Sequence, residues 1–214
     1  MTENPVTIAV VEDDDTLRDN LVEIITSSPR WKFVSAYPDG ESALEGLSKS
    51  PTQVVLMDIQ LPGMSGIECV EKLTTRQPDI QVLMVTVYDN NDRIYAALAA
   101  GASGYLLKRD IPTKLLEALE DLLEGGSPMS SAIARKVVKH FKKESPQKNE
   151  NLNLTPRETE ILDLLAKGSL YKEIAWDLGI GVETVRTHLH HIYTKLHVRT
   201  RTEAVVKYLG RNER

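Results

Sequence analysis

Residues 54–58 read Val-Val-Leu-Met-Asp, and residues 7–15 read Thr-Ile-Ala-Val-Val-Glu-Asp-Asp-Asp. In both segments a short apolar run ends abruptly in acidic side chains. Such runs are typical of strands in a parallel sheet that is covered on both faces. The chemistry of these sheets lies beyond the carboxyl ends of the strands. If the two runs are neighbouring strands, Glu12, Asp13 and Asp58 lie close together at one edge of the sheet.

Clustered carboxylates of this kind indicate a cation site. Several carboxylates at close quarters repel one another unless a hard cation or a proton lies between them. We therefore predict a magnesium site at this edge, with an aspartate exposed as a nucleophile.

The remainder of the first half repeats the alternation of apolar runs and amphipathic segments. The apolar runs occur at residues 6–11, 33–36, 54–57, 81–87 and 104–107. The segments between and after them carry apolar residues at helical spacing, as Leu115, Leu119 and Leu122 do. This repeated alternation predicts a doubly wound α/β fold, in which right-handed crossovers place helices on both faces of an open parallel sheet.

Two further polar side chains stand at strand ends. Thr86 follows the apolar residues 82–85 and Lys108 follows residues 105–107, so both are expected at the same edge as Asp58. A lysine can pair with the oxygens of a phosphoryl group on Asp58, and a threonine can donate a hydrogen bond to it. Taken singly, Lys108 also fits a structural ion pair, and Thr86 fits an ordinary strand-end hydroxyl. Their joint placement with the acids favours phosphoryl chemistry.

Several motifs occur in the order of a known protein family. They are Val-Val-Glu-Asp-Asp at 10–14, Leu-Met-Asp-Ile-Gln-Leu-Pro-Gly-Met-Ser-Gly at 56–66, Thr86, and Ala-Gly-Ala-Ser-Gly-Tyr-Leu-Leu-Lys at 100–108. Through these motifs, residues 5–126 resemble the receiver domain of two-component response regulators. The resemblance implies a flavodoxin-like, five-stranded parallel sheet in which Asp58 accepts phosphate from a partner histidine kinase.

The resemblance also implies roles for the neighbours of Asp58. Asp13, Asp58 and the backbone carbonyl of Gln60 match the ligands of the Mg²⁺ ion, and Glu12 matches a residue that acts mainly through water. Thr86 and Tyr105 match the switch pair of the family, in which the hydroxyl approaches the phosphate and the ring turns inward.

The net charge of −5 conceals a division between the two halves of the chain. Residues 1–128 hold 10 Lys and Arg against 21 Asp and Glu, a net −11, and residues 129–214 hold 16 against 10, a net +6. This division fits a phosphate site joined to a module that binds a polyanion, or simply two solvated surfaces of unlike charge. The single cysteine, Cys69, and the lack of a long apolar stretch predict a soluble cytoplasmic protein that does not enter a membrane.

Residues 127–152 read as a linker between two domains. Gly-Gly-Ser-Pro at 125–128 ends the last helix of the first domain. The spacing of Ile133, Val137 and Val138 predicts a short helix, and a solvated face is favoured over DNA contact for the basic residues around it. Those basic residues are Arg135, Lys136, Lys139, Lys142 and Lys143. Residues 144–151 contain no apolar side chain and predict a flexible tether.

The basic rear part, residues 153–212, predicts an all-α helix-turn-helix domain. Thr-Pro-Arg-Glu at 155–158 has the pattern of a capped helix start. A short second helix ends at Gly179, and a third begins near Val182, which gives two helices joined by a tight turn. In the third helix, Arg186, Thr187 and His190 lie opposite the apolar face, where they suit base edges in a major groove. Lys172 and Lys195 are placed to meet phosphates.

This region is similar to the LuxR-type helix-turn-helix of the NarL/FixJ regulators. The shared residues are Leu-Thr-Pro-Arg-Glu at 154–158, Lys-Glu-Ile-Ala at 172–175, Thr-Val-Arg-Thr-His at 184–188, Lys195, Leu196, Val198, Arg201, Ala204 and Val205. The resemblance implies that Lys172 and Thr184 grip the DNA backbone, and that the helix around Thr202 to Leu209 is a self-association surface. The chain departs from the family pattern at Leu170-Tyr171 and at Gly181, where capping side chains are usual.

The sequence therefore predicts a transcription regulator, not an enzyme, that phosphorylation converts to a DNA-binding homodimer. The alternatives are a magnesium-dependent aspartyl phosphatase and an adaptor that never touches DNA. Such a phosphatase needs a second carboxylate two residues after its nucleophile, where this chain has Gln60. The histidines at 188, 190, 191 and 197 are close in sequence, but their helical positions do not converge on a metal.

Overall fold

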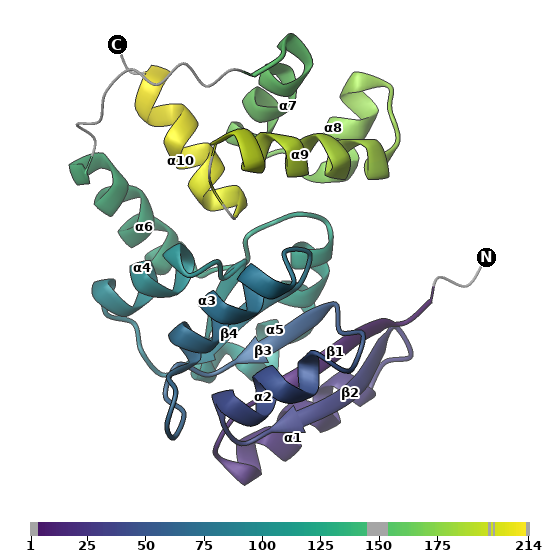
Figure 1. Ribbon diagram of the computed structural model, residues 1–214, viewed down its shortest axis with the longest axis vertical. Helices are drawn as coiled ribbons and strands as arrows, with labels where there is room; N and C mark the ends of the chain where they lie inside the picture. The colour runs from purple at the N-terminus through teal and green to yellow at the C-terminus, as the bar shows by residue number, and fades with distance from the viewer. Residues whose placement is uncertain (1–3, 145–153, 197, 199, 213–214) are drawn as a thin grey trace.

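The computed structural model describes residues 4–144, 154–196, 198 and 200–212. Within these ranges it does not describe the side chains of residues 138–144, 206 and 209–212. Most of the predicted tether, the side chains of Lys139, Lys142 and Lys143, and His197 lie outside this description. Two folded regions follow one another along the chain (Figure 1). None of the described helices combines the length and the apolar character needed to cross a bilayer.

The N-terminal region is built on a five-stranded sheet in which every neighbouring pair is parallel. The strands are β1 (Val6–Val11), β2 (Trp31–Tyr37), β3 (Val54–Met57), β4 (Gln81–Thr86) and β5 (Gly104–Leu107). Their order across the sheet is β2-β1-β3-β4-β5. Val11 pairs with Met57, so the residues that follow β1 and β3 leave the sheet side by side. The predicted α/β sheet is confirmed.

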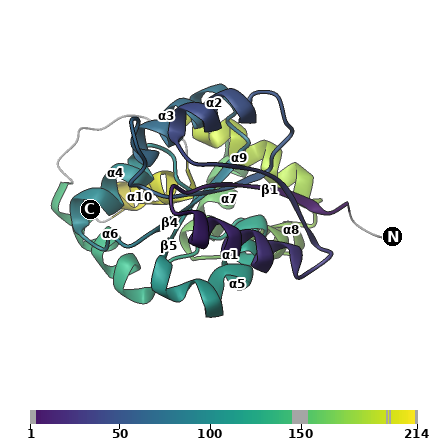
Figure 2. The same ribbon diagram turned by 90° about the horizontal axis from the view of Figure 1, so that it is seen from below.

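Helices cover both faces of this sheet. They are α1 (Asp15–Thr26), α2 (Gly40–Leu47), α3 (Gly66–Arg76), α4 (Asn91–Ala99) and α5 (Ile111–Leu123). Figure 2 shows α2, α3 and α4 on one side of the sheet and α1 and α5 on the other. Alternate residues of β1 pack into the cores on the two faces of the sheet, because successive strand side chains point in opposite directions. Ala9 and Val11 join the core under α2 to α4, and Ile8 and Val10 join the core over α1 and α5.

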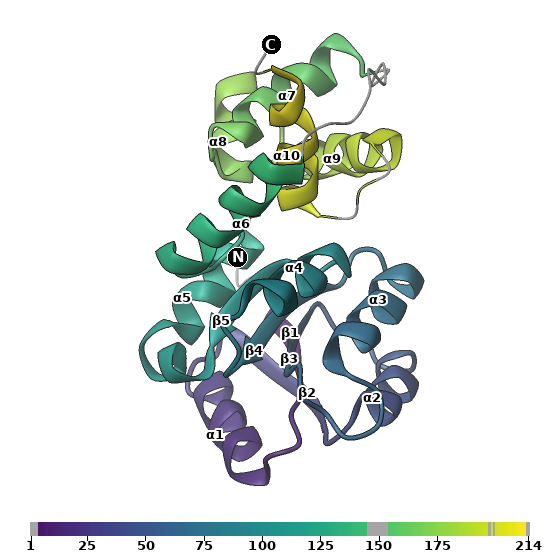
Figure 3. The same ribbon diagram turned by 90° about the vertical axis from the view of Figure 1, so that its left-hand side faces the viewer.

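The segment after α5 extends the N-terminal core rather than leaving it. The amide of Tyr105 on the edge strand β5 donates to the carbonyl of Pro128 at 2.8 Å, and Met129 forms a parallel bridge with the same tyrosine. Helix α6 (Ser131–Glu144) then contacts α4 (Figure 3). Its Ile133 and Val137 are almost fully buried in the core that contains Tyr105. The edge strand is thus covered, which removes a row of unpaired backbone groups from solvent.

The C-terminal region is a four-helix domain with its own apolar core. Its helices are α7 (Pro156–Ala166), α8 (Tyr171–Leu178), α9 (Val182–Leu196) and α10 (Arg201–Asn212). The apolar face predicted for α9 is buried, and Gly179 ends α8 in the left-handed conformation with φ of 61°. The all-α fold and the helix-turn-helix, formed by α8 and α9, are confirmed.

Glu158 ties the start of α7 to the end of α9. It completes a capping box with Thr155, whose backbone amide donates to it at 2.7 Å. The Lys195 ammonium donates to both carboxylate oxygens at 2.8 and 2.7 Å. Burial alone would raise the pKa of Glu158, but the hydrogen bonds from Lys195 and Thr155 outweigh it and lower the pKa below its usual value.

Gly66, the first residue of α3, is required by a close backbone approach. A Cβ atom there would lie 1.7 Å from the carbonyl oxygen of Asp58. We expect Gly66→Ala to lower the free energy of unfolding of the N-terminal domain by about 3 kcal/mol or more, because backbone must move. Gly40, the first residue of α2, is the matched control, since a Cβ there approaches Met64 oxygen at 3.2 Å. Gly40→Ala should cost about 1 kcal/mol or less; equal losses in urea unfolding would contradict this reading.

The Glu158–Lys195 pair makes the stability of the C-terminal domain depend on pH. Because the folded pKa of Glu158 is lowered, its contribution is complete above the unfolded value of 4.5 and is lost as the pH falls through the folded pKa. Glu158→Gln should lower the free energy of unfolding by about 2 kcal/mol at pH 7. At acid pH, the stability of this variant should change less with pH than that of the unchanged protein. Calorimetric melts between pH 3 and 7 measure this. Glu160→Gln, which removes an exposed ion pair with Arg157 on the same helix, should leave the curve nearly unchanged, because such surface pairs contribute little.

Candidate phosphoacceptor site and DNA-binding surface

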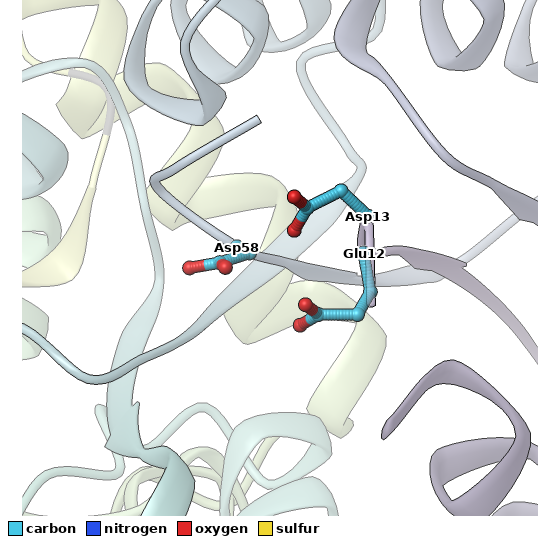
Figure 4. Close-up of side chains that lie close together, drawn as sticks. All are labelled: Glu12, Asp13 and Asp58. Atoms are coloured by element: carbon cyan, nitrogen blue, oxygen red, sulfur yellow. The ribbon is translucent and has the colours of Figure 1, made fainter. Parts of the chain in front are cut away.

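Three carboxyl groups converge where β1 and β3 end. Glu12 and Asp13 follow β1 and Asp58 follows β3, and one oxygen of each lies within 4.8 Å of the others. Figure 4 shows the side chains of Glu12 and Asp13 pointing toward Asp58. Glu12 and Asp58 are only 1% and 4% exposed, whereas Asp13 is exposed to solvent. The predicted cluster is therefore present, and two of its acids are removed from water.

Lys108 holds the cluster together from the end of β5. Its ammonium group donates to Glu12 Oε1 at 2.8 Å and to Asp58 Oδ2 at 2.7 Å. Burial alone would lower the pKa of Lys108, but the hydrogen bonds to Asp58 and Glu12 raise it above its usual value. Burial raises the pKa of Glu12, and the bond from Lys108 only partly offsets this. One positive charge thus faces two buried carboxylates, which leaves the pocket short of positive charge.

The oxygen atoms that remain suit a hard cation. Glu12 Oε2 is buried and has no hydrogen-bond partner, and Asp13 adds an exposed carboxylate beside it. A buried, unpaired carboxylate oxygen is costly unless a cation or a proton satisfies it. An all-oxygen set with one solvent-facing member fits Mg²⁺, which keeps several of its waters. Gln60 follows Asp58 by two residues, and its side chain accepts a hydrogen bond from the Tyr88 hydroxyl.

The predicted switch pair lies beside the acid pocket. Thr86 at the end of β4 is fully buried, and its hydroxyl oxygen accepts weakly from the Tyr88 amide at 3.4 Å. Tyr105 is also fully buried, with its ring turned inward and its hydroxyl donating to the Tyr88 carbonyl at 2.8 Å. Burial raises the pKa of Tyr105, so the phenol remains a neutral donor. The residues at 86, 88 and 105 form one connected group.

Three supporting residues escaped the sequence-based reasoning. Arg18 on α1 donates to the Glu12 carbonyl at 2.8 Å, Glu41 on α2 accepts from the Met64 amide at 2.9 Å, and Tyr88 binds Gln60. Each fixes a loop of the pocket. Arg18 and Glu41 form hydrogen bonds with backbone groups. Because nearly every residue supplies such groups, the pattern of side chains in the sequence does not predict these contacts.

The predicted DNA-binding residues divide into two groups. Thr184, Thr187 and His190 are exposed on α9 together with Arg186, opposite the buried apolar face. This confirms that they share one face of the helix. Lys195 is exposed as well, but its ammonium is bound to Glu158 inside the domain. The structure does not bring Lys195 together with the others, and its predicted phosphate contact stays a prediction.

Two of the predicted DNA-binding cations contact the N-terminal domain. The Lys172 ammonium is bound to the Glu124 carboxylate, and Arg186 donates to the Leu123 carbonyl at 3.1 Å. The Tyr171 amide donates to the Glu124 carbonyl at 3.0 Å, and Arg201 donates to the Gly125 carbonyl. All these acceptors lie at the carboxyl end of α5, where helix carbonyls lack partners and carry partial negative charge.

Comparisons with known proteins agree with this two-domain arrangement. Residues 8–120 match the response regulator receiver domain family, and residues 152–208 match the luxR family of bacterial regulatory proteins. The transcriptional regulatory protein DegU of Brevibacillus brevis is 31% identical over 97% of this chain and 94% of its own length. The nitrate/nitrite response regulator protein NarL of Escherichia coli K12 is 31% identical over 95% of each chain.

The fold is shared with a solved structure. The RcsB response regulator of Salmonella typhimurium is 23% identical and superposes with a TM-score of 0.60, covering 97% of this chain and 98% of its own. At this identity the likeness shows the fold alone. The receiver match, however, covers the acid cluster, the luxR match covers the helix-turn-helix, and both relatives cover nearly the whole chain. The chain therefore belongs to the two-component response regulators that join a receiver domain to a LuxR-type DNA-binding domain, a family of transcription regulators rather than enzymes.

Proposed function

We propose that Asp58 is the phosphoacceptor of this response regulator and that its phosphorylation controls the binding of α9 to promoter DNA. The observation that carries the proposal is the position of Asp58. It follows the central strand β3, between the acids that follow β1 and Thr86 at the end of β4, and it accepts from Lys108 at 2.7 Å, so a phosphoryl group on it would meet a cation at once. The donor is a partner histidine kinase, as the family membership implies.

The transfer step uses groups that the pocket already presents. A carboxylate oxygen of Asp58 attacks the phosphorus of the phosphohistidine, the P–N bond breaks, and the imidazole takes the electron pair and a proton. Asp13, Asp58 and the carbonyl of Gln60 would hold Mg²⁺, with Glu12 acting through water; the ion supplies charge neutralisation for the transferred group. Lys108 then pairs with the phosphoryl oxygens, and the Thr86 hydroxyl donates to one of them.

The contact between the domains supports a resting state in which DNA binding is restrained. Lys172 and Arg186, two proposed DNA ligands, are bound to the end of α5. Tyr171, one of the departures from the family pattern, lies against Gly125, where a Cβ would come within 2.4 Å of its ring. Phosphorylation need only favour a state in which this contact is absent. The freed domains then bind promoter DNA as a homodimer, with Arg186, Thr187 and His190 toward the bases and Lys172, Thr184 and Lys195 toward the phosphates.

Asp58→Asn tests the phosphoacceptor directly. The variant should gain no phosphoryl mass on incubation with acetyl phosphate and Mg²⁺, because the amide is not a nucleophile, while the unchanged protein gains one phosphoryl group per chain. Asp19→Asn, which alters an exposed acid on α1 outside the cluster, should be labelled like the unchanged protein. Intact-protein mass spectrometry measures the phosphoryl mass gained by the unchanged protein and by both variants. Phosphoryl transfer to the Asp58→Asn variant would contradict the assignment.

Glu124→Gln tests the restraint. Removing the charge partner of Lys172 should raise the affinity of the unphosphorylated protein for DNA about two- to fivefold, the range that a partly exposed ion pair supports. The probe is a duplex selected from a random pool by the phosphorylated protein, and binding should weaken steeply with salt. Glu117→Gln, an exposed acid on the same helix, should have no effect. Identical affinities for Glu124→Gln and the unchanged protein would show that this contact does not restrain binding.

A further inference from the structure

The loop between β4 and α4, residues 87–90, offers two consecutive carbonyl groups to two different parts of the molecule. The hydroxyl of Tyr105 donates to the Tyr88 carbonyl at 2.8 Å. The ammonium of Lys136, on helix α6, donates to the next carbonyl along, that of Asp89. The loop begins directly after Thr86. The buried hydroxyl that is proposed to meet the phosphoryl group and the first helix of the linker are therefore joined through one short stretch of backbone.

Helix α6 is fastened to this region at several points. Ile133 and Val137 are 1% and 4% exposed and lie in the core that includes Ile94 of α4. Lys136 shares their face of the helix, since it follows Ile133 by three residues. Its own backbone carbonyl accepts from the Tyr95 hydroxyl on α4 at 2.7 Å. Lys136 thus contacts α4 with its carbonyl and the loop with its side chain.

The linker also holds Tyr105 from the other side. The amide of Tyr105 donates to the Pro128 carbonyl, and Met129 is paired with it across the edge of β5. The tyrosine is therefore bound at its hydroxyl by the loop and at its backbone by the start of the linker. Residues 128–137 cannot keep all these contacts if the loop and the ring move relative to one another, because packed contacts shift between discrete arrangements rather than stretch.

From this arrangement we propose that α6 is the output element of the phosphorylation switch, with Lys136 as the positioning residue that couples it to the β4–α4 loop. The inference rests on the proposed function, and adds to it the route by which Asp58 acts on the second domain. When Thr86 moves toward a phosphoryl group, the loop that follows it moves as well, and the Asp89 carbonyl moves with the loop. The Lys136 ammonium then either follows this carbonyl or loses its hydrogen bond to it. Helix α6 shifts in response, and with it α4, which contacts α10 of the DNA-binding domain. Figure 3 shows α6 extending from α4 toward α10.

A matched pair of substitutions on the full chain tests this route. Lys136→Met removes the ammonium and keeps the apolar stem, and Arg135→Met removes the charge of the exposed neighbouring residue. Two quantities are measured for each: phosphoryl incorporation from acetyl phosphate with Mg²⁺, and the gain in affinity for the selected duplex on phosphorylation. Lys136→Met should be labelled normally, while its gain in affinity, about 5- to 150-fold for couplings of this kind, falls about threefold or more.

Two companion variants distinguish coupling from a loss of charge or of fold. Lys136→Arg should restore most of the gain, because a guanidinium can donate to the Asp89 carbonyl. Tyr95→Phe, which removes only the hydroxyl that holds the Lys136 carbonyl, should lower the gain in the same direction. A normal gain in Lys136→Met, or an equal loss in Arg135→Met, would overturn the assignment of Lys136 while leaving Asp58 as phosphoacceptor. Failure of the unchanged protein to take up phosphate would instead overturn both proposals.

Discussion

The bridge from Lys108 to Glu12 and Asp58 is the interaction on which the rest of this account depends. It joins the end of β5 to the ends of β1 and β3, and it gives two buried carboxylates a shared cation at 2.8 and 2.7 Å. One ammonium cannot balance three acids, so the pocket retains a need for positive charge. This shortage of positive charge suits a divalent ion. Lys108 is also close enough to Asp58 to pair with the oxygens of a phosphoryl group on that residue. The proposed binding of the ion, the proposed transfer of the phosphoryl group and the proposed movement of Thr86 all depend on this one arrangement.

The acid pocket could be predicted from the sequence because parallel strands impose it. Once Val11 and Met57 are neighbours in register, Glu12 and Asp58 must leave the same edge of the sheet. The periodicity of α9 likewise determined which of its residues are buried and which are exposed. These are regular patterns, and side-chain spacing alone reports them. The placement of Lys108 at the end of β5 followed from the same rule.

The contacts that connect the parts could not be predicted in this way. Lys195 carries a charge that suits phosphate, but its partner Glu158 lies 37 residues away and is brought to it only by the packing of α7 on α9. Lys136 was interpreted as part of a solvated face, yet it binds a backbone carbonyl, a group that every residue possesses. The same holds for Arg186 on the Leu123 carbonyl. Every residue supplies a backbone acceptor, so the sequence does not show which side chain will donate to it. The partner is known only once the fold is known.

The contact between Tyr171 and the end of α5 reports most directly whether phosphorylation of Asp58 separates the domains. The Tyr171 amide donates to the Glu124 carbonyl at 3.0 Å, and hydrogen exchange of this amide can be followed in the intact protein. Once every chain carries phosphate, as a mass spectrum can verify, the amide should exchange markedly faster while those in the sheet keep their protection. Unchanged protection of Tyr171 in fully phosphorylated protein that has gained affinity for DNA would contradict the account.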